Sequence, residues 1–238
     1  MLCLFVPRPL VIAHRGASAE APENSLAAFA RALALGADGV ELDVRMSRDG
    51  IPVVFHDATL ARLAGRRQRL GRLTFADLRS VRVRREGIPS LAEVLALIRD
   101  RALTQIELKT GASVEAVVRV VRQARAVDRV ILASFAGDAV RAAQRLAPGI
   151  PRMLISHRNR LRSLAPALAG VDALGLSVDH RAVISPDFIG RLHDRGWRVW
   201  CWTVNDPTAM TRLADWGADA LLSDNPALLK ATLSQTLT

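Results

Sequence analysis

Short apolar runs alternate along the chain with longer stretches whose apolar residues recur at helical spacing. Most of the runs are continuous, which is typical of strands covered on both faces, as in parallel sheets. Strand followed by helix, repeated along the chain, predicts an α/β fold. The predicted strands are Leu10–Ala13, Gly39–Val44, Pro52–Phe55, Gln105–Leu108, Val130–Ser134, Arg152–Ile155, Ala173–Ser177, Arg198–Thr203 and Ala220–Ser223. The clearest predicted helices are Ser25–Leu35, Ser90–Arg99, Val114–Ala126, Asp138–Leu146, Pro186–Arg195 and Pro207–Trp216.

A short glycine-led sequence recurs three times between a predicted helix and the next strand, beginning at Gly36, Gly170 and Gly217. Glycine at a helix C-terminus adopts the left-handed cap conformation, so a strand can follow at once. Repetition of this turn favours eight βα units closed into a TIM (β/α)8 barrel. Nine runs are one more than the barrel needs. Because Pro52–Phe55 follows the turn sequence Arg48-Asp49-Gly50, we predict that it forms a hairpin with the strand before it.

The segment 58–89 fits the repeat poorly. It contains several glycines, many arginines and one short helix candidate, Thr74–Val81. We predict that it is a small insertion after the second barrel strand. No linker or low-complexity segment divides the chain, which predicts a single domain over residues 1–238.

Length and composition are those of a globular protein, with 238 residues of which 50% are apolar. No apolar run reaches the ~20 residues needed to span a bilayer. The N-terminus lacks a basic segment and a small-residue cleavage site, so we predict no secretory signal and a cytoplasmic location. The two cysteines, Cys3 and Cys201, provide neither a disulfide framework nor metal-binding spacing.

The formal net charge is +10, and only Lys109 and Lys230 among the basic residues are lysines. This balance is compatible with a non-catalytic barrel that binds nucleic acid through its arginines. The alternative is a coding bias toward arginine with the charge on solvated surfaces. We favour the second interpretation, because arginines occur along the whole chain and tyrosine, which stacks on bases, is absent.

Carboxylates occur at the ends of two successive predicted strands. Glu41 and Asp43 are two residues apart and therefore face the same side of a strand. Burying two unpaired carboxylates is costly, and a divalent cation bound by their oxygens removes that cost. Glu107 and Lys109 repeat the spacing on the next strand. Three carboxylates without cysteine favour a hard cation over zinc, and the alternative is an ion-pair cluster in which Arg15 and Lys109 neutralise the acids.

His14 and His56 also lie at predicted strand ends. Histidine gives and takes protons near neutral pH. Two histidines beside a cation, Arg15 and Lys109 suit the cleavage of a phosphate ester, with the basic groups on the phosphoryl oxygens. The other histidines, His157, His180 and His193, are interpreted as structural residues.

These residues, in this order, resemble the glycerophosphodiester phosphodiesterase family. The resemblance covers residues 14 to 226 and rests on several short motifs. They are His14-Arg15-Gly16, Pro22-Glu23-Asn24-Ser25, Glu41-Leu42-Asp43-Val44, Val53-Val54-Phe55-His56-Asp57, Ile88-Pro89-Ser90-Leu91, Ile106-Glu107-Leu108-Lys109, Trp202-Thr203-Val204-Asn205 and Ser223-Asp224-Asn225-Pro226.

The resemblance implies a TIM barrel with an insertion after its second strand and one divalent cation, Mg²⁺ or Ca²⁺. The counterparts of Glu41, Asp43 and Glu107 bind the cation, and those of His14 and His56 are the acid–base pair. The counterparts of Arg15 and Lys109 hold the phosphate, and that of Trp202 lines the substrate site. The implied reaction is hydrolysis of a glycerophosphodiester to sn-glycerol 3-phosphate and an alcohol.

Within this mechanism we assign His14 as the base and His56 as the acid. Ser25 and Asn24 are expected to cap the following helix. A lysophospholipase D of the same superfamily is an alternative, and it requires an apolar groove for an acyl chain. The insertion offers apolar residues for such a groove at Leu60, Leu63, Leu70, Leu73 and Phe75. The expected partner is a small-molecule substrate, without nucleic acid or stable membrane insertion, and the insertion could support a homodimer.

Overall fold

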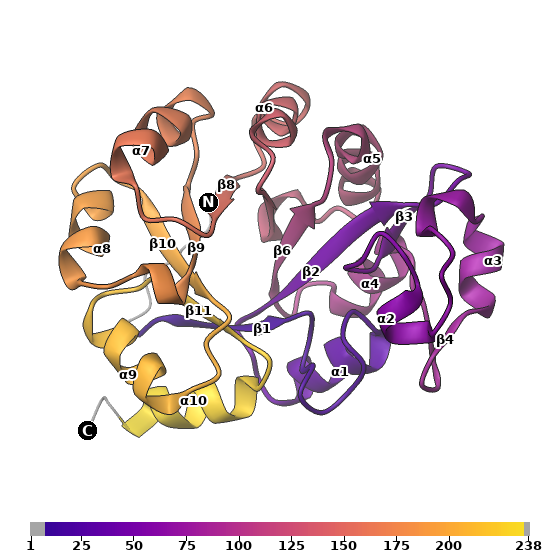
Figure 1. Cartoon of the computed structure of the whole chain (residues 1–238), viewed down its shortest axis with the longest axis horizontal. Helices are drawn as coiled ribbons and strands as arrows, with labels where there is room; N and C mark the ends of the chain where they lie inside the picture. Colours follow the sequence, from indigo (N-terminus) through magenta and orange to yellow (C-terminus); the bar gives the residue numbers. More distant parts are fainter. Residues whose placement is uncertain (1–7, 236–238) are drawn as a thin grey trace.

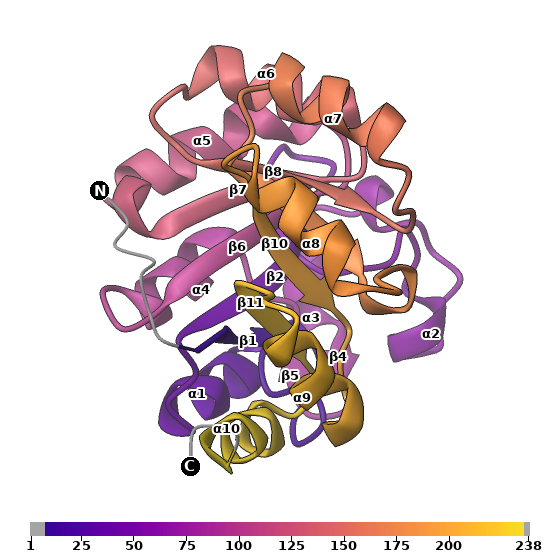
Figure 2. The same ribbon diagram turned by 90° about the vertical axis from the view of Figure 1, so that its left-hand side faces the viewer.

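Eight parallel strands form a closed barrel in the computed structural model, which describes residues 8–235. The strands follow the order β1-β11-β10-β9-β8-β7-β6-β2, and β1 pairs with β2 to close the ring. Figures 1 and 2 show the helices packed around this ring. The predicted TIM barrel is confirmed. The barrel strands are β1 (Leu10–His14), β2 (Gly39–Met46), β6 (Leu103–Leu108), β7 (Val130–Ser134), β8 (Arg152–Ser156), β9 (Gly175–Asp179), β10 (Arg198–Trp202) and β11 (Ala220–Ser223).

The helices of the outer layer include all six predicted from the sequence. They are α1 (Leu26–Ala34), α4 (Leu91–Ile98), α5 (Val114–Gln123), α6 (Gly137–Leu146), α7 (Leu161–Gly170), α8 (Pro186–His193), α9 (Pro207–Asp215) and α10 (Pro226–Gln235). Short 3₁₀ turns are η2 (Gly111–Ser113), η3 (Val127–Arg129) and η4 (His180–Ala182). Helix α7 was not predicted, because it contains Pro166, a residue that normally ends a helix. Among residues 8–235, no helix combines the length and the apolar character needed to cross a membrane.

Two of the three predicted glycine caps are present. Gly36 and Gly217 have φ angles of 70° and 88°, in the left-handed region. The prediction for Gly170 is wrong, because α7 continues through this residue and the positive φ falls on Asp172 instead. The following strand β9 accordingly begins at Gly175, two residues later than predicted. Cys3 and the predicted absence of a signal sequence at the N-terminus concern residues 1–7, outside the described part of the chain.

The extra run, Pro52–Phe55, forms the predicted hairpin. Strand β3 (Pro52–Val54) pairs antiparallel with β2. The segment 58–89 follows it and lies to one side of the barrel, beside β2 and β3 (Figure 1). Its elements are α2 (Ala61–Ala64), η1 (Leu70–Arg72), α3 (Phe75–Ser80), β4 (Arg82–Val83) and β5 (Glu86–Gly87). Helix α3 begins after Thr74, whose side chain and that of Asp77 form a reciprocal cap.

This insertion has a small hydrophobic core of its own. Leu60 and Leu70 are buried in it, and Leu63, Leu73 and Phe75 pack against it. The five residues considered for an acyl-chain groove therefore pack in or against this core.

Alternation along the strands separates the two sides of the barrel wall. Leu10 and Ile12 of β1 belong to a cluster that fills the barrel interior, and Val11 between them packs toward the helices. The same alternation puts His14 on the interior side, at the carboxyl end of β1. On β2, Val40, Leu42 and Val44 pack toward the helices and leave the intervening carboxylates for the interior. The barrel interior therefore becomes polar at the carboxyl ends of its strands.

Candidate active site

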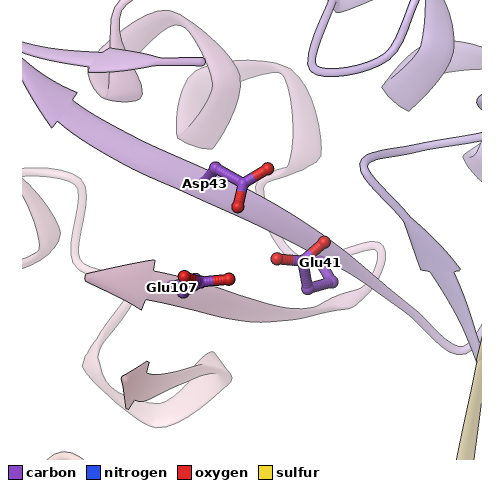
Figure 3. Close-up of side chains that lie close together, drawn as sticks. All are labelled: Glu41, Asp43 and Glu107. Atoms are coloured by element: carbon purple, nitrogen blue, oxygen red, sulfur yellow. The ribbon is translucent and has the colours of Figure 1, made fainter. Parts of the chain in front are cut away.

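Three carboxylates converge at this end of the barrel. Glu41 and Asp43 extend from β2, and Glu107 extends from the adjacent strand β6 (Figure 3). The parallel register pairs Asp43 directly with Glu107. One oxygen from each of the three carboxylates lies within 4.8 Å of the others. The spacing in the sequence therefore brings together the side chains that we predicted as metal ligands.

Two basic side chains neutralise part of this acidic cluster. The Lys109 ammonium lies 2.6 Å from Asp43 Oδ1 and 2.5 Å from Glu107 Oε1. Arg15 Nε lies 3.3 Å from Asp43 Oδ2. Burial alone would raise the pKa of Asp43, but the charges of Lys109 and Arg15 outweigh it and hold that pKa well below its usual value. The predicted ion-pair cluster is thus present around Asp43.

Glu41 lacks such compensation. Within the described residues, its carboxylate accepts a hydrogen bond from the Arg15 backbone amide at 3.1 Å and lies 3.9 Å from His14 Nε2, with no lysine or arginine side chain paired to it. Burial and the neighbouring charge of Asp43 raise the pKa of Glu41 to about 8. The cluster therefore combines three buried carboxylates with the two cationic side chains of Lys109 and Arg15. The unbalanced charge and the all-oxygen donor set fit a divalent cation such as Mg²⁺ or Ca²⁺.

Arg15 follows β1 in a left-handed turn. Its φ is 57°, and Gly16 after it has a φ of 82°. A Cβ on Gly16 would lie 2.7 Å from the backbone of Ala28 in α1, so only glycine fits this approach. The turn directs the Arg15 amide to Glu41 and its guanidinium to Glu23, with Nη1 at 2.8 Å from Oε1. One residue thereby contacts the cluster through both its backbone and its side chain.

His14 is oriented by a carboxylate from the far end of the chain. Its Nδ1 lies 2.7 Å from Oδ1 of Asp224, which follows β11. Ser18 and Asn205 donate to the Asp224 carboxylate at 3.0 and 2.7 Å. Burial lowers the pKa of His14, but the hydrogen bond to Asp224 and the charge of Glu41 outweigh it, so that pKa is raised. Nε2 is left facing the cluster.

His56 has an equivalent partner that is adjacent in sequence. Its Nδ1 lies 2.6 Å from Asp57 Oδ1. Arg62 of the insertion donates to the other Asp57 oxygen at 2.6 Å and to both oxygens of Glu23 at 2.7 Å. Because Glu23 also binds Arg15, this guanidinium connects the surroundings of the two predicted catalytic histidines. Burial lowers the pKa of His56 below its usual value, despite the opposing effect of Asp43 and Asp57.

A cavity of about 290 Å³ opens over these groups. His14, Arg15, Glu41, His56 and Glu107 line its polar side. The opposite side is largely apolar and aromatic, and is lined by Phe135, Ile155, His157, Trp202 and Leu222.

Three of these rings pack together at the apolar wall. The Phe135 and His157 rings stack with centroids 4.9 Å apart, and the Trp202 ring contacts both edge-on at 5.7 and 5.0 Å. Phe135 remains 45% exposed. This arrangement suits a small ligand that carries a phosphate at one end and a less polar group at the other.

All eight site residues predicted from the sequence therefore lie in one region. Lys109 stands behind the carboxylates, and the other seven surround or line the cavity. Ser25 caps α1 as expected, by accepting from the Ala28 amide. The prediction that Asn24 also caps this helix is wrong, because its side-chain amide donates to Asp43 at 2.8 Å.

Sequence reasoning missed several residues around the cavity. No motif in the sequence pointed to Phe135, and His157 was interpreted as structural although it lines the cavity. Asp224 occurs in a motif that we singled out, and its position after a barrel strand could have suggested a partner for His14. His193 is a structural residue, as expected, and bonds to Asp219 at 2.8 Å.

Comparisons with known proteins agree with this geometry. A model of the glycerophosphoryl diester phosphodiesterase family matches residues 14–228. The chain belongs to this family. This phosphodiesterase is 32% identical to a glycerophosphodiester phosphodiesterase of Caldanaerobacter subterraneus over 236 residues, which cover 93% of this chain and 96% of the relative. It is also 32% identical to a probable glycerophosphodiester phosphodiesterase 2 of Mycobacterium tuberculosis, over 94% of this chain and 90% of that protein.

Solved structures give the same family. The phosphodiesterase superposes with a TM-score of 0.90 on a phosphodiesterase of Oleispira antarctica, solved in complex with the product sn-glycerol-3-phosphate. The two are 29% identical, and the match covers 95% of this chain and 97% of the other. The predicted family and enzyme class are confirmed, so this phosphodiesterase is a hydrolase of glycerophosphodiesters. The alternative of a non-catalytic basic barrel is thereby set aside.

Proposed function

We propose that this enzyme hydrolyses glycerophosphodiesters to sn-glycerol 3-phosphate and an alcohol, with a divalent cation at the carboxylate cluster and His14 and His56 as the acid–base pair. The observation that carries the proposal is the convergence of both histidines and the carboxylate cluster on one cavity. The product bound to the Oleispira antarctica relative supports the same substrate class.

The metal ligands in this proposal are Glu41, Asp43 and Glu107. When bound, the cation supplies positive charge that polarises a phosphoryl oxygen and lowers the proton affinity of a bound oxygen. Arg15 and Lys109 supply further positive charge toward the phosphate. Before a substrate arrives, the pair with Asp43 holds Arg15 beside the cavity and holds Lys109 behind the carboxylates.

The two histidines are set up for proton transfer in the same way. Each has its Nδ1 on an aspartate, so Nε2 is the nitrogen available to the substrate. One histidine takes the proton of the nucleophile, which is water or the neighbouring glycerol hydroxyl. The nucleophile attacks phosphorus, and the ester P–O bond breaks. The other histidine gives its proton to the leaving alcohol oxygen. When the glycerol hydroxyl is the nucleophile, the product of this step is a cyclic phosphate, and a water molecule then attacks its phosphorus and opens the ring to sn-glycerol 3-phosphate, with the two proton transfers reversed.

The sequence assignment makes His14 the base and His56 the acid. In the chain without a cation, the pKa of His14 is raised and that of His56 is lowered, which favours the reverse order. A cation on Glu41 would neutralise one of the charges that raise the pKa of His14 and would thereby lower that pKa. Kinetics on substrates with different leaving groups should therefore assign the roles.

A lysophospholipase D activity is a second candidate, supported by the exposed Phe135 ring on the apolar wall of the cavity. Glycerophosphocholine and lysophosphatidylcholine share a headgroup and differ in one acyl chain. We expect a higher kcat/KM for glycerophosphocholine, because the apolar residues of the insertion are packed in its own core.

The deciding experiment is release of sn-glycerol 3-phosphate from glycerophosphocholine by purified enzyme, with EDTA and then with added Mg²⁺ or Ca²⁺. EDTA should abolish turnover and one of the cations should restore it. A Glu41→Gln variant should require a higher cation concentration, and Glu20→Gln, an exposed carboxylate away from the cluster, is the matched control. Full activity in EDTA would disprove the cation requirement, and absence of product with either cation would disprove the substrate.

A further inference from the structure

The insertion carries most of the surplus charge of the protein. Residues 58–89 contain nine arginines and two acidic residues, a net charge of +7 out of +10 for the chain. These arginines have different surroundings. Arg62 binds the aspartate beside His56, and Arg79 pairs with Glu93. Within residues 8–235, the guanidinium groups of Arg66 and Arg67 are exposed and have no ion-pair or hydrogen-bond partner, as expected for solvated surface.

Two of the arginines line a second cavity, beside the catalytic one. Arg69 and Arg72 lie on either side of Gly71 at η1 and form one wall of a space of about 340 Å³. The end of β2 and the segment after β6 form the other walls, which include Arg45, Lys109 and Thr110. Figure 1 shows the insertion beside β2 at this side of the barrel. Three separate segments of the chain thus meet at this second cavity.

Basic residues line this cavity, namely Arg45, Arg69, Arg72 and Lys109, and no acidic residue is among its lining. The Lys109 ammonium pairs with Asp43 and Glu107, so the surplus positive charge comes from the arginines. Neither Arg69 nor Arg72 has a side-chain partner in the part of the chain that the structure describes. Like charges gathered around a concave space raise its positive potential and favour an anion. Arginine guanidinium groups bind phosphate oxygens through charge-assisted hydrogen bonds.

The second cavity adjoins the catalytic one through two direct contacts. Arg45 Nε donates to the backbone carbonyl of His56 at 2.7 Å. Lys109 contacts Glu107, which lines the catalytic cavity. The two cavities are therefore neighbours that share part of a wall.

We infer that the cavity between η1, β2 and the end of β6 binds a second phosphate on the alcohol arm of the substrate. The inference rests on the proposed function and adds a preference, within its substrate class, for glycerophosphodiesters whose alcohol carries a further phosphate. Arg69 and Arg72 are the residues that select this class. They bind the second phosphate, while the scissile diester lies against Arg15 and the two histidines.

The test compares two substrates that differ by one phosphate, glycerophosphoinositol and glycerophosphoinositol 4-phosphate. Wild-type enzyme should show a kcat/KM about tenfold higher for the phosphorylated compound, a magnitude typical of two partly exposed charge pairs. The double variant Arg69→Gln, Arg72→Gln should lose this preference through KM and change kcat/KM for glycerophosphoinositol less than about twofold. Replacement of the same two residues by lysine should retain part of the preference.

The matched control is Arg66→Gln, Arg67→Gln, which removes the same charge from the same insertion outside the cavity. It should keep the preference. Equal kcat/KM values for the two substrates in wild-type enzyme would overturn the inference and leave the proposed function intact. An equal loss of the preference in the Arg69/Arg72 and Arg66/Arg67 double variants would also overturn it, because the total charge of the insertion would then explain the preference. The proposed function is tested separately on glycerophosphocholine. If neither inositol compound were hydrolysed, their dissociation constants by calorimetry would decide the inference, and equal values would overturn it.

Discussion

The two histidine–aspartate pairs of the site have nearly the same hydrogen-bond distance, but the groups that bind the two aspartates differ in charge. His14 and Asp224 are 2.7 Å apart across the seam where the first and last strands meet, and His56 and Asp57 are 2.6 Å apart within one loop. Neutral donors hold Asp224, whereas the Arg62 guanidinium holds Asp57. The pKa of His14 is raised and that of His56 is lowered. Proton affinity is thus set by the groups around each pair and not by the pair alone.

The largest effect should come from removing either histidine. His14→Ala and His56→Ala should each lower kcat on glycerophosphocholine by about 10³-fold, because each loses a proton transfer. Circular dichroism should remain that of wild type. On an aryl phosphodiester, whose leaving group needs no proton, the variant that lacks the acid should lose much less activity. The sequence assignment expects this for His56→Ala, the opposite result would exchange the two roles, and wild-type turnover in either variant would exclude that histidine from catalysis.

The partner aspartates should have intermediate effects that differ in kind. Asp224→Asn should lower kcat/KM by about 100-fold and Asp57→Asn by about tenfold, because Asp224 lies in the more extensive hydrogen-bond network. Each substitution removes a group that raises the pKa of its histidine. With His14 as base and His56 as acid, Asp224→Asn moves the acidic limb of the pH profile to lower pH. Asp57→Asn moves the basic limb to lower pH. Unchanged profiles in both variants would show that neither aspartate tunes its histidine.

Breaking the link between the insertion and the second pair should have a smaller effect. Arg62→Gln should lower kcat/KM about threefold, because this side chain is half exposed and its ion pairs are screened. The loss should appear mainly in kcat if Arg62 orients Asp57. Arg66→Gln, at an exposed position in the same insertion, is the control and should retain wild-type kinetics. A loss confined to KM would indicate a role in substrate binding instead.

The smallest effect concerns stability in acid. Hydrogen bonds from His14 and Asn205 outweigh burial and lower the pKa of Asp224 to about 2. A carboxyl group with a lowered folded-state pKa stabilises the fold above its unfolded pKa and loses this contribution as the pH falls toward 2. Asp224→Asn should therefore lower the free energy of unfolding by roughly 1 kcal/mol at pH 7. Urea unfolding at pH 7 and pH 3.5 should show the difference between variant and wild type shrinking at the lower pH, and a difference independent of pH would contradict this linkage.

The barrel and most of the cluster were predictable because they depend on local rules. Continuous apolar runs marked the strands, and the two-residue spacing of Glu41 and Asp43 put both on the interior face. The partner of His14 could not be derived in this way, since Asp224 is 210 residues away and only the closed ring brings them together. The contact of Arg62 with Asp57 depends on the packing of an insertion that has no repeat. Helix α7 was missed because Pro166 hides its periodicity.

The closure of the ring also has a consequence for the timing of activity during synthesis. The clustered carboxylates on β2 and β6 leave the ribosome long before Asp224, and β11 is the strand that pairs with β1 to complete the barrel. A nascent chain can therefore carry all three carboxylates while His14 still lacks the residue that orients it. The enzyme should become competent only after its last strand has been made and inserted, and chains that lack this strand should not turn over phosphodiesters.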